Sequence, residues 1–165
     1  MLEILEQAEE LLPNFLNASS NWKSVNIDYH PPRVERLWRQ WGQYRIYLHC
    51  IHTCRASEAL FHPHPWPSAM TILKGTYEMA IGYGTGLEIP PIAALVITGP
   101  GTRYEMTDKD AWHYVRPLVG TAMTVMVTGE PWIRESHGSD SPLAPLPRKR
   151  VHELLAYFRS KYPPK

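Results

Sequence analysis

A series of short runs that favour β-strands, with no helical segment between them, places the strongest constraint on the fold of this chain. The runs are rich in Val, Ile, Tyr, Trp and Thr and are separated by Gly and Pro. Parallel strands need a crossover of about a dozen residues or more, usually a helix, so these runs predict an antiparallel barrel or jelly roll. We expect the strands at 34–41, 44–53, 70–74, 76–82, 92–98, 103–106, 112–118 and 123–128.

Amphipathic helices are expected on both sides of these strands. Apolar residues recur at helical spacing near the N-terminus and again near the C-terminus. We place the first helix at about residues 2–16 and the second at about 148–162, before Pro163. The barrel then occupies about 33–128, and a chain of 165 residues has the usual size of one compact domain. We therefore expect a single all-β domain over 1–165, with a helix at each end.

Charge and apolar content exclude several classes of partner. The formal net charge is +1 and no long basic run occurs, so no nucleic-acid partner is expected. No stretch approaches the ~18 apolar residues that a membrane span requires, and the N-terminus lacks the pattern of a signal peptide. We therefore expect a cytoplasmic protein. Cys50 and Cys54 would lie about 13 Å apart on one extended strand, too far for a disulfide, so reduced thiols are expected.

The most informative chemical signal is the segment around His62 and His64. Two histidines at positions i and i+2 of an extended segment point to the same side, so one ion can bind both imidazoles. Pro63 and Pro65 restrict the backbone and would hold the pair in place. Taken alone, the pair also fits a surface turn of histidine and proline without a metal.

This segment resembles the first motif of the cupin superfamily, which reads His-x-His, three or four residues, Glu, six residues and Gly. His62 and His64 match the histidine pair, and Gly75 matches the glycine. The glutamate is absent, because its position holds Ser68 or, on the other spacing, Ala69. Neither side chain can replace a carboxylate ligand.

The second cupin motif, which reads Gly, five residues, Pro-x-Gly, two residues, His, three residues and Asn, also has a counterpart. Counted from Gly101, His113 stands at the position of the motif's histidine plus one residue. Residues 108–110, Asp-Lys-Asp, replace Pro-x-Gly, and a charged tight turn is chemically reasonable there. Pro117 replaces the asparagine. The resemblance covers about residues 55–128.

This resemblance implies a cupin double-stranded β-helix, which is a jelly-roll barrel, with a divalent metal ion on His62, His64 and His113. Because the glutamate is absent, the site also resembles that of the three-histidine thiol dioxygenases, which use Fe(II). This resemblance is looser than the one to cupins in general. Three ligands on one face leave positions open for substrate and dioxygen. Fe(II) is therefore favoured, although Zn, Mn, Ni and Co also accept imidazole ligands.

Three further residues are candidates for catalysis. His52 is assigned to the face of its strand that lines the barrel, where it could transfer protons or be a satisfied core histidine, and His49 is then expected to be exposed. Glu78 could turn inward as a fourth ligand or a base, or face solvent. Tyr104 could donate a hydrogen bond to a bound oxygen atom or be only a core aromatic residue.

The expected substrate pocket is lined by residues that lie near the histidines in the sequence or on the neighbouring strands. Trp66 adjoins His64 and could form a wall of the pocket. Arg103 could hold a substrate carboxylate with two hydrogen bonds, or be a solvated charge on its strand. The full expected set is Trp66, Ser68, Met70, Met106 and Arg103.

These features favour a non-haem iron dioxygenase that acts on a small organic molecule. A cupin isomerase, lyase or hydrolase is the second hypothesis, with the metal as Lewis acid and Glu78 or His52 as the proton carrier. A non-catalytic cupin that binds a small molecule or only the metal is the third. The run at 34–41 is rich in aromatic residues and is expected to be an edge strand, so we also expect a homodimer.

Overall fold

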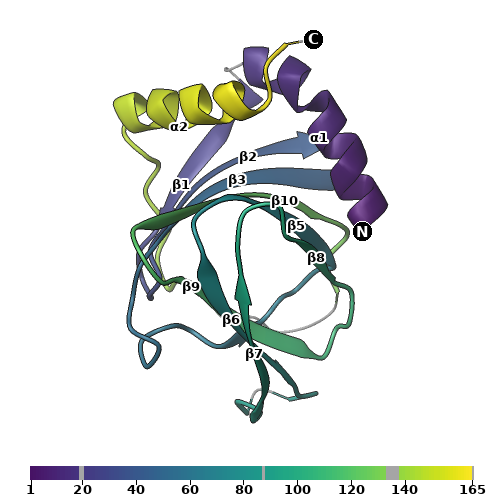
Figure 1. The fold of residues 1–165 in the computed structure, drawn as a ribbon, viewed down its shortest axis with the longest axis vertical. Coiled ribbons are helices and arrows are strands. Elements are labelled where there is room, and N and C mark those ends of the chain that lie inside the picture. Colours follow the sequence, from purple (N-terminus) through teal and green to yellow (C-terminus); the bar gives the residue numbers. More distant parts are fainter. Residues whose placement is uncertain (19–20, 87, 133–137, 165) are drawn as a thin grey trace.

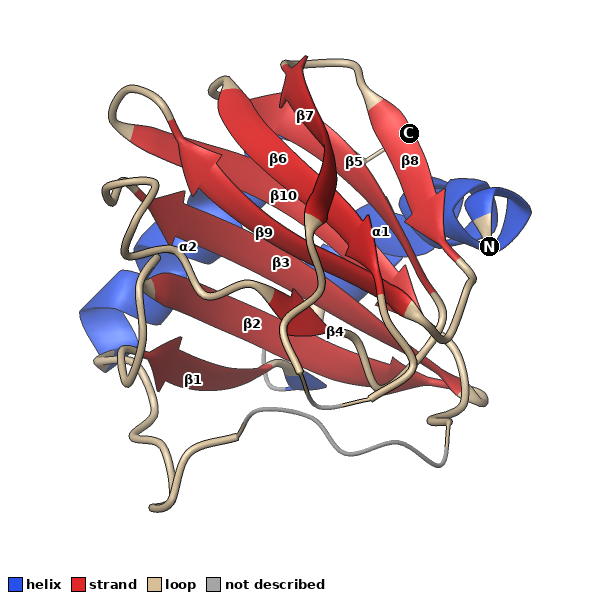
Figure 2. Cartoon of the chain, turned by 90° about the horizontal axis from the view of Figure 1, so that it is seen from below, coloured by secondary structure: helices blue, strands red, loops and turns tan. Residues whose placement is uncertain are grey.

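Two antiparallel sheets face each other, and two helices cover the outer face of the larger sheet (Figure 1). The computed structural model describes residues 1–18, 21–86, 88–132 and 138–164. The helices are α1 (Leu2–Asn17) and α2 (Arg148–Lys161). Seen from below, the smaller sheet lies in front of the larger one, and the helices lie behind both (Figure 2).

The strands of the larger sheet come from both ends of the barrel sequence. Its order is β1 (Lys23–Ile27), β2 (Val34–Trp41), β3 (Tyr44–His52), β10 (Thr121–Thr128), β5 (Ser68–Lys74) and β8 (Arg103–Met106). The smaller sheet has the order β4 (His62–Pro63), β9 (Ala111–Pro117), β6 (Tyr77–Tyr83) and β7 (Ile92–Thr98). All the strand pairs are antiparallel, as the sequence predicted.

The largest core lies between the helices and the larger sheet. One face of α1 is apolar at helical spacing and is buried, and α2 buries a matching face. Because side chains alternate along a strand, one set of β3 residues packs against the helices and the other set faces the second sheet. The first set includes Ile46, Leu48 and Cys50.

Smaller apolar clusters fill the space between the two sheets. One of them joins Ile51 of β3 to Tyr77 and Met79 of β6. The turn before β6 brings the chain very close to β10, since a Cβ added to Gly75 would lie 2.6 Å from the carbonyl oxygen of Thr121. Gly75 also has a φ of 82°, which favours glycine. The turn at Gly75, the glycine that matches the first motif, therefore packs directly against β10.

The observed strands agree closely with the runs expected from the sequence. The bounds of β2, β7 and β8 are those predicted, and the other expected strands differ by a few residues at their ends. β1 and β4 were not expected. Because β1 pairs with β2 along its whole length, β2 is not an edge strand, and this argument for a homodimer was wrong.

β7 lies at the edge of the smaller sheet and has the exposed apolar character that was expected of 34–41. Among the described residues it pairs only with β6, so its other edge has no backbone partner. Its first six residues are all exposed and none is charged. Leu95 is 60% exposed and Ile97 58%. A long apolar edge of this kind invites pairing with another strand.

Two expectations about the whole chain can be compared directly with the structure. In the part of the chain that the structure describes, no helix combines the length and the apolar character that crossing a membrane requires. Cys50 and Cys54 are both free thiols. Cys50 is buried beneath the helices, and burial is the main cause that raises its pKa.

Candidate metal centre

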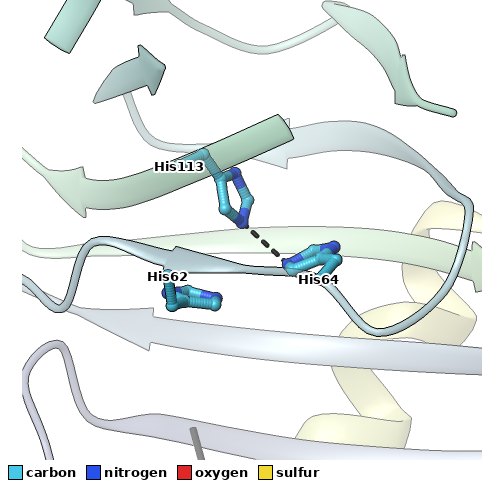
Figure 3. A group of neighbouring side chains, drawn as sticks. All are labelled: His62, His64 and His113. Atoms are coloured by element: carbon cyan, nitrogen blue, oxygen red, sulfur yellow. Dashed lines mark hydrogen bonds between the residues drawn. The ribbon is translucent and has the colours of Figure 1, made fainter. Parts of the chain in front are cut away.

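The fold brings His62, His64 and His113 together from two segments that are far apart in the sequence. His62 lies on β4 and is paired directly with His113 on β9, while His64 follows β4 by one residue. One ring nitrogen of each histidine lies within 4.8 Å of those of the other two. Figure 3 shows the ring of His113 pointing down from its strand toward His64, with the ring of His62 alongside.

Hydrogen bonds at Nδ1 orient two of these rings. Nδ1 of His62 donates to the carbonyl oxygen of Leu60 at 2.8 Å, which fixes its proton on Nδ1. Nδ1 of His64 lies 3.3 Å from Oγ of Ser68. With Nδ1 as donor, each ring keeps a lone pair on Nε2, the form in which imidazole binds metals.

The ring of His113 lies so close to that of His64 that a cation could bind to both. Nε2 of His113 lies 2.7 Å from Nε2 of His64, so these two nitrogens can share only one proton. Nδ1 of His113 is buried and has no hydrogen-bond partner among the described residues. Two nitrogens bound to one ion at about 2.1 Å and at right angles lie about 3 Å apart, so the two rings need little movement to accept an ion between them. The donor set therefore fits a divalent metal.

Burial favours the neutral form of two of the imidazoles, those of His64 and His113. Removal from water lowers the pKa of His64 and of His113 well below the ordinary value, and the neighbouring histidines lower both further. Neutral imidazole is the form that a metal ion requires. At neutral pH, these two rings therefore need no deprotonation before a metal binds.

A cavity of ≈ 200 Å³ opens beside the three rings. Its wall is mostly apolar or aromatic and includes Trp66 and Met70, two of the residues expected there. No Asp or Glu lies among the described residues of this wall. The wall consists of Ile27, Tyr29, His30, Pro32, Val34, Arg36, His49, Ile51, Leu60, His62, Pro63, His64, Pro65, Trp66, Met70, His113, Val115 and Met126.

Other residues expected at the site lie in a neighbouring cavity. Tyr104 and Met106 line a separate space of ≈ 240 Å³. The hydroxyl of Tyr104 forms a hydrogen bond of 2.7 Å with that of Tyr77 and donates to Sδ of Met70 at 3.1 Å. Burial raises the pKa of Tyr104 to about 12, so its hydroxyl stays neutral. Tyr104 therefore reaches the histidine pocket only through Met70.

The structure places Glu78 and Arg103 away from the pocket. Glu78 accepts hydrogen bonds from Arg116 at 2.8 and 3.2 Å and from the Tyr114 hydroxyl at 2.8 Å, and these bonds lower its pKa. Its strand position has the opposite parity to that of Ile81, which is paired with His113. Arg103 forms an ion pair of 2.6 Å with Glu9 on α1. Both side chains are held by partners outside the histidine pocket.

The expected orientations of His49 and His52 are reversed. His49 is 3% exposed and lines the histidine pocket, whereas Nε2 of His52 contacts Glu35 at 3.2 Å on the outer face of β3. Both faces of β3 are buried, one under helices and one under the second sheet, so apolar alternation cannot tell them apart. His49 is thus a pocket residue that sequence reasoning missed.

A second group of side chains with metal-binding atoms lies on that outer face. It consists of Glu35, Cys50 and His52. Both carboxylate oxygens of Glu35 accept hydrogen bonds from Arg150 of α2, the shortest at 2.7 Å. The guanidinium therefore occupies the ligand atoms that a metal ion would need.

Comparisons with known proteins support the fold. No protein-family model matches the chain, and no curated protein matches it in sequence. Among solved structures, it is similar to hydroxypropylphosphonic acid epoxidase from S. wedmorenis, with a TM-score of 0.52, 14% identity and coverage of 67% of this chain and 56% of that chain. FeII HppE matches with a TM-score of 0.52 at 15% identity, and FeII HppE in complex with substrate with 0.53 at 13%, each over 67% of this chain and 57% of that chain.

The aligned regions cover 56–57% of the length of the solved chains. With sequence identities of 13–15%, these matches show the fold alone. Together with the two facing sheets and the flanking helices, they agree with the cupin barrel that the sequence predicted.

Proposed function

We propose that this protein is a metal-dependent cupin oxygenase, a non-haem iron dioxygenase that acts on a small organic molecule. The observation that carries the proposal is the convergence of three imidazoles, His62, His64 and His113, at a largely apolar pocket whose described wall has no carboxylate. A bound Fe(II) would supply one-electron chemistry and open coordination positions. Imidazole also suits Zn, Mn, Ni and Co, so the donor set favours iron without requiring it.

The chain's own residues perform three tasks in this proposal. The contacts of Nδ1 of His62 and of His64 hold these rings in the binding orientation. Trp66, Met70 and Val115 contribute an apolar wall that limits the access of water to reactive species. The pocket bounds the size of the substrate, because a cavity of about 150 Å³ in another protein accommodates benzene.

The Lewis-acid isomerase, lyase or hydrolase is less well supported. That hypothesis assigned proton transfer to Glu78 or His52, and both side chains are engaged elsewhere. No carboxylate lines the histidine pocket among the described residues, so it lacks the group most often available besides histidine as a general base. An oxygenase reaction needs no carboxylate in the pocket, which favours the first hypothesis.

The proposal is tested by loading the protein with Fe(II) under anaerobic conditions and adding nitric oxide as a probe of dioxygen. We expect about one iron per chain and the electron paramagnetic resonance signal of an iron–nitrosyl complex, which requires an open position. A matched sample of the His113→Ala variant should give neither. If the wild type binds iron but forms no nitrosyl complex, the oxygenase proposal is wrong and a metal-binding or Lewis-acid role remains.

We also propose that two copies of the chain pair through β7 to form a homodimer. The exposed edge needs a strand as partner, and antiparallel pairing of β7 with its copy satisfies the twofold symmetry of a dimer. β7 carries no charge that would oppose this pairing, and its apolar side chains project from both faces. A second copy therefore covers the unpaired edge and packs its own apolar side chains beside those of β7.

Analytical ultracentrifugation at tens of micromolar tests the dimer. The wild type should sediment at twice 19.0 kDa, and the double variant Leu95→Lys, Ile97→Lys should be a monomer. Val119→Lys is the matched control, because Val119 is apolar and 83% exposed but lies outside β7. A monomeric wild type, or a lysine variant that still dimerises, contradicts the proposal.

A further inference from the structure

Arg36 projects from β2 into the histidine pocket. It is paired across the strands with His49, and both residues line the cavity. Nε of Arg36 donates to Nε2 of His49 at 2.9 Å, and the guanidinium carbon lies 4.9 Å from the centre of the Tyr47 ring. The side chain is therefore held by one ring nitrogen and one aromatic face.

The charge of Arg36 is not neutralised within the described structure. Arg33, Arg55, Arg103, Arg116 and Arg150 each form an ion pair with a glutamate, whereas none of the described carboxylates forms one with Arg36. No hydrogen bond runs from its terminal nitrogens to a described residue. An arginine side chain stays protonated at neutral pH, so a full positive charge faces a pocket that has no acid in its described wall.

The residue that positions Arg36 is itself neutral. His49 is buried, and burial lowers its pKa well below the ordinary value, with the Arg36 charge lowering it further. Nδ1 of His49 lies 3.2 Å from Oγ1 of the buried Thr124, and this oxygen is suited to accept a hydrogen bond from Nδ1–H. Nε2 is then free to accept from Arg36. The imidazole orients the guanidinium without cancelling its charge, unlike a carboxylate.

We infer that Arg36 binds the anionic group of the substrate, so that the pocket takes a small organic molecule with a terminal oxyanion, such as a carboxylate or a phosphonate. The inference names the substrate class of the proposed oxygenase site and so rests on that proposal. A guanidinium offers two parallel N–H donors, which match two oxygens of either group. The apolar wall then accommodates the remainder of the molecule.

Arg36 also lies close enough to the histidines to act in the same site. The side chains of Arg36 and His64 both line the same cavity of ≈ 200 Å³. A molecule whose oxyanion binds Arg36 therefore extends toward the three imidazoles, with its reacting end beside them.

The test is a binding titration of the metal-free protein at neutral pH, followed by ligand-observed nuclear magnetic resonance. The probes are butanoate, propylphosphonate and the neutral butanamide, which are similar in size. Metal-free protein is used because a metal ion would itself attract anions. We expect the wild type to bind one or both acids at least about 10-fold more tightly than the amide, and the acid that binds more tightly identifies the preferred oxyanion.

Three variants decide whether Arg36 is responsible. Arg36→Met should lose the preference for acids and keep the weak binding of the amide, and Arg36→Lys should retain part of the preference. Arg103→Met removes an arginine that pairs with Glu9 outside the pocket and should leave the preference unchanged. If the wild type prefers neither acid, or if Arg36→Met keeps the preference while its circular dichroism is native, the inference is wrong.

The outcome is independent of the metal experiment. An acid preference that depends on Arg36, in a protein that binds no iron, supports the anion site and contradicts the oxygenase proposal. Stoichiometric iron with a nitrosyl signal, in a protein whose acid preference does not depend on Arg36, does the reverse. The two proposals can therefore fail separately.

Discussion

The two faces of the β2–β3 pair carry two polar clusters that differ in their balance of charge. Glu35 and Arg36 are neighbours on β2 and point to opposite faces. On the outer face, Glu35 is 4% exposed and is neutralised by Arg150, with Arg33 and His52 also in contact. On the inner face, the described contacts of Arg36 are with the rings of His49 and Tyr47, and none is with a carboxylate.

This difference supports a structural role for the outer cluster and agrees with the ligand-binding role that we propose for the inner one. A buried charge with a partner attaches one element to another, as Glu35 attaches α2 to β2. A partly buried charge without a partner costs stability and is retained where it binds something else. Among the described residues, the inner face also presents three imidazoles and no carboxylate in the pocket wall, so the contrast extends from Arg36 to the candidate metal centre.

The largest effect should come from removing a metal ligand on the inner face. We expect His62→Ala, His64→Ala or His113→Ala to lower the affinity for a divalent metal by more than about 100-fold, because one of three ligands is lost, while the fold persists. Metal analysis beside circular dichroism measures both quantities.

His52→Ala is the matched control for these variants, because His52 belongs to the outer group that also has metal-binding atoms. It should leave metal binding unchanged, since Arg150 occupies the oxygens of Glu35. Loss of metal in His52→Ala, or full occupancy in His113→Ala, would reverse the roles of the two faces.

Stability gives the next contrast. Arg150→Met leaves Glu35 buried with only Arg33 and His52 as partners, and we expect a loss of about 2 kcal/mol in the free energy of unfolding. Arg36→Met removes a charge that has no carboxylate partner, so its change should be within about 1 kcal/mol and in the stabilising direction. Urea denaturation of the metal-free proteins measures both. Equal losses would show that Arg36 is a structural residue like Arg150.

The pH dependence of stability sharpens the same contrast. Burial raises the pKa of the Glu35 carboxyl, but hydrogen bonds from Arg150 and His52 outweigh this effect, so the net pKa is lowered. A lowered carboxyl pKa contributes stability above the pKa of the unfolded chain, and this contribution disappears as the pH falls through the folded value. We expect the free energy of unfolding to fall less on acidification in Glu35→Gln than in the wild type. Urea denaturation at a series of acid pH values measures this difference. An unchanged acid profile would mean that the outer ion pair adds little.

Much of the fold could be predicted from the sequence because it depends on local pattern. The runs at 34–41, 92–98 and 103–106 have strand-forming residues bounded by turn residues, and their bounds agree with the structure. β1 was missed because Lys23–Ile27 is only five residues long, and its alternation of polar and apolar residues covers only Ser24 to Ile27. β4 has only two residues and exists through its pairing with β9, which no local pattern reveals.

The candidate site was predictable only where the family spacing fixed it. The three histidines were identified from motif positions, and the structure brings them together. Arg36 and His49 were missed because their contact depends on the register between two strands. The direction in which β3 faces depends on which side the helices cover, and this is a property of the whole fold.

The smallest effect concerns Ser68, which stands where the cupin motif has its glutamate. Its Oγ lies near Nδ1 of His64, on the opposite side of the ring from Nε2, so Ser68 would orient the proposed ligand and would not bind the ion itself. Ser68→Ala should weaken metal binding by about 10-fold or less, because His64 loses an acceptor that holds its ring in place. Ser68→Asp should tighten binding by a similar factor, because a carboxylate acceptor makes Nε2 a stronger donor to the metal.

Thr71→Ala on the same strand is the matched control, since the Thr71 hydroxyl is buried and has no hydrogen-bond partner among the described residues. Competition titrations with a chelator measure all three variants. If Ser68→Asp weakens binding as much as Ser68→Ala, position 68 supports the ring through packing alone.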